Sequence, residues 1–577
     1  MAIIADGEVT RLAAAVGSKD RLTDELVLVC DYHDRNATSI CRQGHVARVA
    51  PYIGSNRMRV VCISAECEPW AKTGGLGDVV DALARAVASV GEQEPSGEHV
   101  VQPQVWVGTG GVMGQAPGGV LPHVERPVDV FLPRYRGVPV PENATVTPLA
   151  VPDPHAPDGV TEVKLVEFEA RGYRVRLVDH PPAFDREGYY GDDDGDYADN
   201  GWRFGLLCRA ALEALLDDDR PVDVLHLHDW QSMPAVLMRD IAYAGYPRIF
   251  DAAVVVTIHN LAYQGWLSRE QLAGLATADE IAQLVGRHAD GLLLLREGIR
   301  RAELVNTVSP GFAAEVLTQE LGMGMDKVLT GLGHRFGGIL NGLDTVVWNP
   351  ATDDALPANY SRGDLAGKAE CRRALLTEVG FDPDDDRAVL GMISRLDPQK
   401  GFDLLAGAAK DLLVEGGRIV VLGTGDPKLV ADLRALAKKR PDAVAVIERF
   451  DRALARRIYA GADLYLMPSR FEPCGQGQMI ALRYGTPAIV HRTGGLADTV
   501  VDADAFPEEG TGFVFEAPRT AAFLDACRRA MSHFHAGGIA WAELQDRGMA
   551  IDWSWEAGPA EQYAATYRRA ISLRRER

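Results

Sequence analysis

The chain has 577 residues, a formal net charge of −21, and a composition of 47% hydrophobic and 24% charged residues. This length exceeds one ordinary hydrophobic core, so we expect at least two domains in a soluble globular protein. The acidic balance argues against a nucleic-acid partner, although a cleft on an acidic protein can still be locally basic. The chain contains no apolar run of membrane-spanning length, so we expect no membrane partner.

The start of the chain and its cysteines both favour a cytoplasmic protein. The first residues, MAIIADGEVT, lack the basic and apolar regions of a secretory signal. The eight cysteines are scattered and form no C-x-x-C pair, which fits a reducing compartment and indicates no metal site.

Two N-terminal segments carry little secondary-structure pattern. Residues 1–57 have mixed charge, one short apolar run at 26–30 and no clear periodicity. We favour a dispensable extension before a functional start near Met58, and the alternative is a small ordered cap. Residues 91–127 are rich in Gly, Pro, Val and Gln, which predicts an inserted surface excursion.

A glycine-rich turn follows the first good strand, at residues 59–64. The turn, Lys72-Thr73-Gly74-Gly75-Leu76-Gly77-Asp78, leads into a helix with apolar residues at helical spacing. Glycines let the backbone approach a ligand, the helix start supplies free N–H groups, and Lys72 adds positive charge. The pattern favours anion binding, although a glycine turn alone is more often structural, and Asp78 could equally cap the helix.

Polar residues recur where buried strands of the first half end. Asp229 follows the strand expected within 222–228, and His259 and Asn260 follow the strand at 253–258. His226 and His228 lie on one face of their strand, which could suggest a metal pair. Because the sequence shows no third ligand, we expect a hydrogen-bonded role for these histidines.

A second series of elements begins near residue 336. Its expected strands are residues 389–394, 418–422, 443–447 and 464–467. Arg395 and Lys400 follow the first of these strands. Strand and helix alternate in both halves, which predicts two successive α/β domains with parallel sheets.

The stretch 468–498 places a carboxylate and a second glycine turn at strand ends. Glu472 follows the strand at 464–467, and a helix is expected over Gln476–Tyr484. The next strand ends in Thr493-Gly494-Gly495 before another helix. Ligands of open α/β sheets bind at this carboxyl edge.

A cleft between two such domains would gather these residues. Cations beside glycine turns suit a diphosphate, whereas carboxylates, His and Asn suit sugar hydroxyls, so the set suggests a nucleotide sugar. The residues expected in the cleft are Lys72, Asp78, Asp229, His259, Asn260, Asn341, Arg395, Lys400, Glu472, Gly494 and Gly495.

The chain resembles bacterial glycogen synthases and plant starch synthases, which are retaining glucosyltransferases of glycosyltransferase family 5. Matching motifs run in family order from about residue 58 to the C-terminus. They are KTGGLGDV from Lys72, HDWQ from His228, HNLAYQG from His259, TVSP from Thr307, LNGLD from Leu340, SRL from Ser394, QKG from Gln399, PSRFEPCG from Pro468 and RTGGLADTV from Arg492.

The resemblance implies a GT-B fold, in which two Rossmann-like doubly wound domains face each other across a cleft. It implies an extension at 1–57, an acceptor-side domain at 58–336 with an insertion near 91–127, and a donor-binding domain at 337–550. It also implies that residues 551–577 form a helix that crosses back to the first domain. The apolar stripe at 560–571, which must be buried, would then pack on the first domain.

The implied reaction is that of a hexosyltransferase. Glucose would pass from ADP-glucose to the non-reducing end of an α-1,4-glucan, as in glycogen, without cofactor or catalytic metal. By resemblance, the catalytic residues are Glu472, His259, Arg395 and Lys400. The donor-binding residues are Lys72, Gly74, Gly75, Asp229, Asn341, Cys474, Gly475, Thr493, Gly494 and Gly495, and the acceptor or structural residues are Asp78 and Tyr263.

The chain departs from the family at 1–57, at 91–127 and after Gly475, where many members carry Leu-Thr and this chain has Gln476-Gly477. Cys474 is expected to be a packing residue and not a nucleophile, and Tyr263 is either core or a sugar-stacking ring. Two alternative functions stay open: a transferase that uses UDP-glucose, and a catalytically silent glucan-binding relative. The presence of Glu472, Lys72 and both strand-end cations argues against the second alternative.

Overall fold

The structure is a computed structural model that describes residues 2–5, 8–11, 58–89, 128–192, 195–273, 275, 277, 280, 283 and 290–577. The chain divides into two compact units, residues 1–56 and 57–577. In the first unit, β1 (Ala2–Ala5) and β2 (Glu8–Arg11) form an antiparallel hairpin. The remainder of the expected extension and the excursion at 91–127 lie outside the described residues.

The first sheet of the second unit has nine strands in the order β15-β14-β11-β10-β3-β4-β7-β6-β5. All neighbours are parallel except β5 with β6 and β6 with β7. Its strands are β3 (Val60–Ile63), β4 (Val128–Pro133), β5 (Thr145–Pro152), β6 (Val160–Ala170), β7 (Tyr173–Asp179), β10 (Val224–His228), β11 (Ala253–Ile258), β14 (Leu304–Thr307) and β15 (Phe336–Gly338). The second series of elements, expected from near residue 336, thus opens with β15, which pairs within the first sheet.

The second sheet has six parallel strands in the order β18-β17-β16-β19-β20-β21. They are β16 (Val389–Ile393), β17 (Arg418–Leu422), β18 (Val444–Ile447), β19 (Leu464–Met467), β20 (Ala488–His491) and β21 (Gly512–Phe515). Two small antiparallel pairs complete the strands: β8 (Gly191–Asp192) with β9 (Gly195–Asp196), and β12 (Trp266–Ser268) with β13 (Gly291–Leu293).

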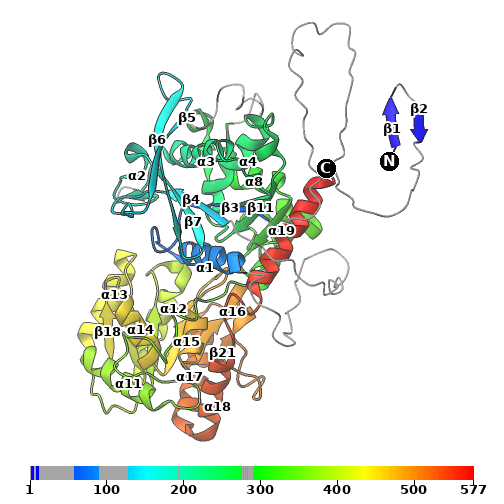
Figure 1. Cartoon of the computed structure of the whole chain (residues 1–577). Coiled ribbons are helices and arrows are strands. Elements are labelled where there is room, and N and C mark those ends of the chain that lie inside the picture. The colour runs from blue at the N-terminus through cyan, green and yellow to red at the C-terminus, as the bar shows by residue number, and fades with distance from the viewer. Residues whose placement is uncertain are drawn as a thin grey trace. The chain divides into compact units, whose positions relative to one another are not determined.

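Helices connect the strands, as the alternating pattern predicts. Those up to β15 are α1 (Gly75–Ser89), α2 (Pro181–Phe184), α3 (Asn200–Leu216), α4 (Asp229–Ile241), α5 (Pro247–Phe250), α6 (Arg269–Leu272), α8 (Leu294–Arg301), α9 (Pro310–Glu315), α10 (Asp326–Leu332) and the 3₁₀ turn η1 (Gly333–Arg335). The later ones are α11 (Ala366–Glu378), η2 (Pro398–Lys400), α12 (Phe402–Val414), α13 (Pro427–Lys439), α14 (Arg452–Gly461), α15 (Gly477–Arg483), α16 (Gly494–Thr499), α17 (Thr520–Ala536), α18 (Gly538–Ala550) and α19 (Pro559–Arg575). Helices α11 to α18 surround the second sheet in Figure 1.

Each sheet has a switch point in its parallel part. In the first sheet it lies between β3 and β10, because β4 is added on one side of β3 and β10, β11, β14 and β15 on the other, while β5, β6 and β7 run back from the edge toward β4. In the second sheet it lies between β16 and β19. The carboxyl ends of strands on either side of such a switch point form the usual ligand site of an open α/β sheet. The expected residues follow these four strands: Lys72 follows β3, Asp229 follows β10, Lys400 follows β16, and Glu472 follows β19.

Helix α19 packs on the first sheet, although it follows the second sheet in sequence (Figure 1). Tyr563 and Tyr567 on its apolar stripe are fully buried. The hydroxyl of Tyr563 accepts a hydrogen bond from Asn306 Nδ2 at 3.1 Å, and that of Tyr567 lies 2.9 Å from His226 Nδ1. The stripe therefore buries its rings while both hydroxyls find polar partners on the strands.

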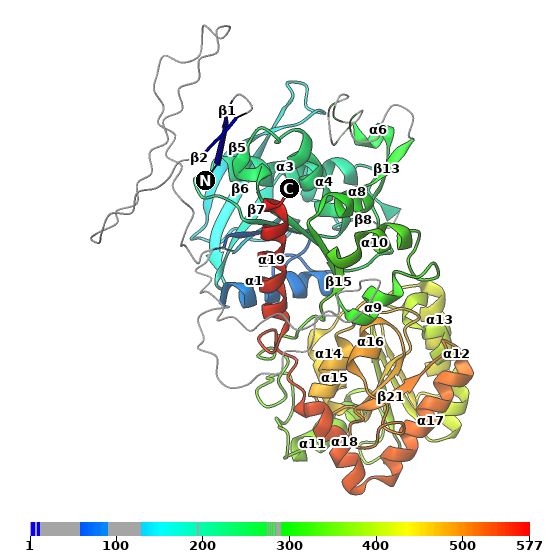
Figure 2. The same ribbon diagram turned by 90° about the vertical axis from the view of Figure 1, so that its right-hand side faces the viewer.

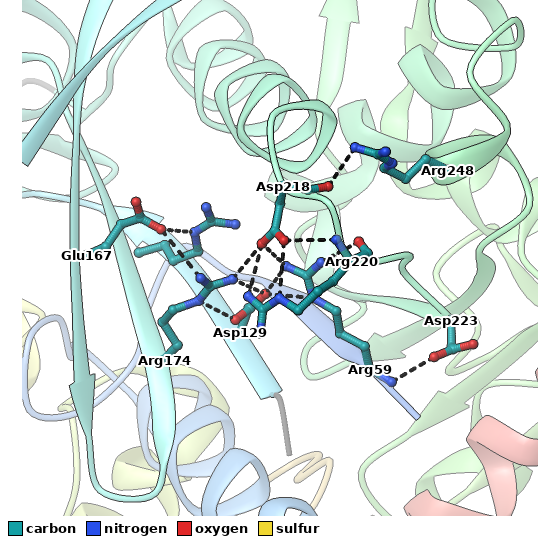
Figure 3. Close-up of polar contacts among 9 residues, drawn as sticks. Arg59, Asp129, Glu167, Arg174, Asp218, Arg220, Asp223 and Arg248 are labelled. Atoms are coloured by element: carbon teal, nitrogen blue, oxygen red, sulfur yellow. Dashed lines mark hydrogen bonds and ion pairs between the residues drawn. The ribbon is translucent and has the colours of Figure 1, made fainter. Parts of the chain in front are cut away.

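A charged cluster joins the amino ends of β3, β4 and β7 (Figure 3). Asp129 is fully buried and accepts hydrogen bonds from Arg59 Nε at 3.0 Å and from Arg174 Nε at 2.7 Å. Both arginines also reach Asp218, at 2.8 and 2.9 Å. Burial alone would raise the pKa of Asp129, but the two guanidinium groups lower it overall. The cluster therefore ties three strands together at the edge opposite the expected site.

Among the described residues, no helix combines the length and the apolar character that crossing a membrane requires.

Candidate active site

Glu472 and Lys400 form an ion pair between two strand ends of the second sheet. Lys400 Nζ lies 2.6 Å from Glu472 Oε2, which also accepts a hydrogen bond from Ser469 Oγ at 2.9 Å. Glu472 is only 6% exposed, so its charge is compensated at close range. Its other oxygen, Oε1, has no hydrogen-bond partner among the described residues and remains available to a ligand.

Local sequence explains how Lys400 reaches this carboxylate. The side chain of Asp397 caps the short turn η2 by accepting a hydrogen bond from the Lys400 N–H. Gly401 has φ 73°, and a Cβ there would lie 2.1 Å from the carbonyl oxygen of Pro468. Only glycine combines that conformation with such a close approach, so the two loops pack directly on each other.

The glycine turn at 493–495 packs directly on the Glu472 loop. Gly495 N–H donates to the Glu472 carbonyl at 3.1 Å, and a Cβ on Gly495 would lie 2.2 Å from the carbonyl oxygen of Cys474. Gly494 and Gly475 both have positive φ, 43° and 71°. These glycines therefore allow close backbone packing, and their expected contact with the donor stays a prediction.

A carboxylate from α9 binds the turn at 493–495. Helices α9 and α16 lie side by side (Figure 2). Glu315 accepts hydrogen bonds from Gly494 N at 2.8 Å and from Thr493 Oγ1 at 2.9 Å. Ser309 Oγ also donates to the Pro473 carbonyl at 2.5 Å. Sequence reasoning missed Glu315 and Ser309 as partners, because nothing in local spacing links α9 to residues near 493.

The first glycine turn holds Lys72 between two carboxylates. Lys72 Nζ lies 2.8 Å from Glu68 and also contacts Asp78. Burial and the adjoining Glu68 raise the pKa of Asp78. Asp78 therefore positions Lys72 in addition to standing in the first turn of α1, and Glu68 in turn pairs with Arg452 of α14 at 2.9 Å.

A buried carboxylate, Glu66, occupies part of the expected anion cradle. It accepts hydrogen bonds from Thr73 N at 2.7 Å, Thr73 Oγ1 at 2.6 Å, Gly74 N at 3.3 Å and Tyr190 at 2.6 Å. The N–H groups of residues 73 and 74 are thus bound to Glu66, whereas the expected anion site at the start of α1, from Gly75 onward, stays a prediction. The position of Glu66 just after the expected strand at 59–64 was a signal that could have marked it as a candidate site residue. Its hydrogen bonds to Thr73 and Gly74 could not be predicted from the sequence.

Asp229 and His259 lie together at the carboxyl ends of β10 and β11. Asp229 Oδ1 accepts a hydrogen bond from the His259 N–H at 2.7 Å, and Asp229 itself has φ 54°. Burial raises the pKa of Asp229 to about 7. His259 Nε2 lies 3.0 Å from Nδ1 of His228, which is fully buried. The expected hydrogen-bonded role of His228 is therefore present in the structure.

The remaining site residues show fewer contacts. Asn341 is buried, its Oδ1 has no partner among the described residues, and it adjoins Cys474, whose pKa burial raises to about 12. A thiol that keeps its proton is a packing group and not a nucleophile. Arg395 is 60% exposed and forms an ion pair with Asp397 at 3.5 Å. Tyr263 is 55% exposed and so is not a core residue.

The departure from the family pattern at Gln476-Gly477 coincides with a close contact between Gly477 and Tyr465. A Cβ on Gly477 would lie 2.8 Å from the hydroxyl of Tyr465, a buried residue of β19. That hydroxyl lies 3.1 Å from the Ile393 carbonyl. Glycine at 477 therefore leaves room for the phenol at the start of α15.

The described residues hold one cluster of possible metal ligands, and its donors do not fit an ion. Cys62, His226 and His228 lie within 4.8 Å of one another and are buried. Both ring nitrogens of His226 and one of His228 are already hydrogen-bonded, and burial raises the pKa of Cys62 to about 12. A buried cation needs several free or deprotonated ligands, which this cluster does not supply.

Two α/β sheets with polar residues at both switch points form the arrangement expected of a GT-B glycosyltransferase, and comparison with solved structures supports that class. The starch synthase IV catalytic domain of Arabidopsis thaliana, bound to ADP and acarbose, matches with a TM-score of 0.76 at 32% identity, covering 89% of this chain and 100% of that chain. Sucrose-phosphate synthase of Thermosynechococcus elongatus matches with a TM-score of 0.53 at 18% identity over the same shares, which supports the fold alone.

Sequence comparisons agree. A starch synthase catalytic domain matches residues 59–94 and 106–331, and a group 1 glycosyl transferase domain matches 379–533. Glycogen synthase of Anaeromyxobacter dehalogenans (strain 2CP-C) is 41% identical over 513 residues, covering 89% of this chain and 99% of that relative. Glycogen synthase of Paracidovorax citrulli is 38% identical over 523 residues, covering 88% and 94%. The chain belongs to the glycogen and starch synthase family.

Proposed function

We propose that this chain is a glycogen synthase that transfers glucose from ADP-glucose to the 4-hydroxyl at the non-reducing end of an α-1,4-glucan, with retention of configuration. The observation that carries the substrate assignment is the starch synthase IV relative, which was solved with ADP and acarbose, a nucleoside diphosphate and an oligosaccharide analogue. The cations and carboxylates at the two switch points suit those two kinds of ligand.

The cations would stabilise the leaving group. As the glycosidic bond to the diphosphate breaks, negative charge develops on the phosphate oxygens, and fixed cations nearby lower the barrier. Lys400 and Arg395 would act from the second sheet and Lys72 from the first. Lys72 and Lys400 are each held by a carboxylate, which fixes the position of both ammonium groups.

Glu472 would stabilise the sugar. The hexose gains oxocarbenium-like positive character in the transition state, and a carboxylate close to the ring favours that charge. The unpartnered Oε1 of Glu472 is the oxygen available for this contact. Retention would follow from a same-face displacement in which the leaving phosphate accepts the proton of the acceptor hydroxyl, so no covalent glycosyl-enzyme is required.

His259, Asp229 and Asn341 would line the glucose site, with the turns at Gly74-Gly75, Cys474-Gly475 and Thr493-Gly494-Gly495 on the donor side. Tyr263 is exposed enough to stack on an acceptor sugar. We place the enzyme in the cytoplasm, because the six cysteines of the described residues are all unpaired, as a reducing compartment favours.

One assay tests the proposal. Full-length protein is incubated with glycogen and either ADP-glucose or UDP-glucose, and released nucleoside diphosphate is measured. We expect faster release from ADP-glucose. Faster release from UDP-glucose would replace the donor assignment, and no release from either donor with several glucan acceptors would favour the silent glucan-binding alternative.

A further inference from the structure

The imidazole of His259 has one ring nitrogen engaged and one free. Its Nε2 faces Nδ1 of His228 at 3.0 Å, and its Nδ1 has no hydrogen-bond partner in the described part of the chain. Two facing imidazole nitrogens form a hydrogen bond only when one carries a proton and the other a lone pair. The position of the proton on His228 therefore decides which form of His259 faces the sugar site.

Both rings are neutral near pH 7. Burial lowers the pKa of His259 to about 3 and the pKa of His228 well below its ordinary value. A neutral imidazole carries one proton, on either Nδ1 or Nε2. Two arrangements are therefore possible: His228 donates and His259 is protonated on Nδ1, or His259 donates from Nε2 and its Nδ1 keeps a lone pair.

The far nitrogen of His228 selects between these arrangements. Nε2 of His228 is buried and has no partner among the described residues. A proton there would be an orphaned buried N–H, which native structures avoid more strictly than an unused acceptor. The adjacent ring of His226, 4.1 Å away between centroids, gives no help because Thr257 and Tyr567 engage both of its nitrogens.

We propose that His228 donates its Nδ1 proton to His259 Nε2 and thereby fixes His259 with its own proton on Nδ1, as a neutral hydrogen-bond donor to a hydroxyl oxygen of the donor hexose. The ligand in this statement rests on the proposed function, whereas the tautomer rests on the protein alone. A neutral donor binds the hydroxyl without adding positive charge beside a sugar that itself becomes positive in the transition state. His228 is then a positioning residue, since it acts through His259.

The tautomer is measurable without substrate. Full-length protein labelled with ¹⁵N-histidine gives ring correlations that separate protonation on Nδ1 from protonation on Nε2. We expect the His259 ring, assigned by its loss in His259→Asn, to be protonated on Nδ1 at pH 7. Protonation on Nε2 in the wild-type protein would overturn the proposal, whether or not the protein is active.

Variants at His228 separate positioning from packing. Asn places an amide near the position of Nδ1 and can donate to His259, whereas Leu cannot. We expect His228→Leu to lose the single tautomer and to lower kcat/KM for ADP-glucose about tenfold, while His228→Asn keeps the tautomer and stays within about threefold of wild type. KM for glycogen should change in neither. Equal losses in both variants would overturn the proposal.

Cys62→Ala is the matched control, because Cys62 lies in the same buried cluster and no hydrogen bond joins it to His259 within the described part of the chain. It should lower thermal stability and leave the His259 tautomer unchanged. If it altered the tautomer as His228→Leu does, general loosening of the sheet would explain both, and the proposal would fall. Absence of nucleotide release by the wild-type protein would refute the proposed function and leave the tautomer result standing.

Discussion

Substitution of Glu472 by Gln tests the central carboxylate with little change in shape. Gln can still accept hydrogen bonds from Lys400 and Ser469 through its amide oxygen, at positions close to the present 2.6 and 2.9 Å contacts. The loss of stability should then be about 1–3 kcal/mol, the usual cost of weakening a buried charge-assisted hydrogen bond. The loss of a charge that stabilises the transition state should lower kcat by about 10²–10³, or roughly 2.7–4 kcal/mol.

The assay combines two measurements on the same preparations. Initial rates of ADP release with saturating glycogen give kcat and KM for ADP-glucose, and urea unfolding gives the free energy of unfolding. Ser469→Ala is the control, because it removes one neutral hydrogen bond to Glu472 and leaves the carboxylate charged. We expect it to lower kcat by less than about tenfold.

The catalytic role of Glu472 would be refuted by Glu472→Gln retaining most of the wild-type kcat. It would also be refuted if Ser469→Ala and Glu472→Gln lost kcat equally, because positioning of the loop would then account for both. A double variant of Glu472→Gln with Lys400→Met adds a check: recovery of activity would mean that the pair serves only structure.

Three further predictions concern other parts of the chain. Asp129→Asn should destabilise the folded protein by up to about 3–5 kcal/mol at pH 7, because Arg59 and Arg174 keep Asp218 but lose the fully buried carboxylate that pairs with both. Folding lowers the pKa of Asp129, so its contribution to the free energy of unfolding is fully present above its unfolded pKa of about 4 and is lost as the pH falls from there through the folded pKa. The difference in free energy of unfolding between the variant and the wild type, measured in urea, should therefore shrink at lower pH. Gly495→Ala should lower the free energy of unfolding by about 1–3 kcal/mol and lower activity, because its Cβ would collide with the Cys474 carbonyl. Gly245→Ala, with open space around it, should change neither stability nor activity. Equal unfolding midpoints for the two variants would contradict this prediction. Tyr567→Phe should cost about 1–3 kcal/mol, because His226 Nδ1 loses its partner, and should leave kcat unchanged; a kcat deficit would mean that α19 acts on the site.

The positions of the buried strands were predictable from local sequence. The strands at 253–258, 418–422 and 464–467 occur with the expected bounds, since short apolar runs bounded by polar turns indicate strands buried on both faces. The same reasoning placed Glu472 and Lys400 at strand ends, and the catalytic roles that the family motifs imply for them stay predictions. The sequence did not predict the antiparallel pair β5 and β6 or the pairing of β15 with the first sheet. Strand pairing depends on neighbouring strands, which the periodicity of one segment does not specify.

By itself, the sequence of this chain determined which residues stand at strand ends and therefore which edge of each sheet carries chemistry. Only the tertiary structure decided what those residues touch: Glu66 within the first glycine turn, Glu315 on the second, and His228 against His259. The physical reason is that strand and helix periods assign a side chain to a face, whereas the group opposite it comes from another element whose register is set by packing of the whole core.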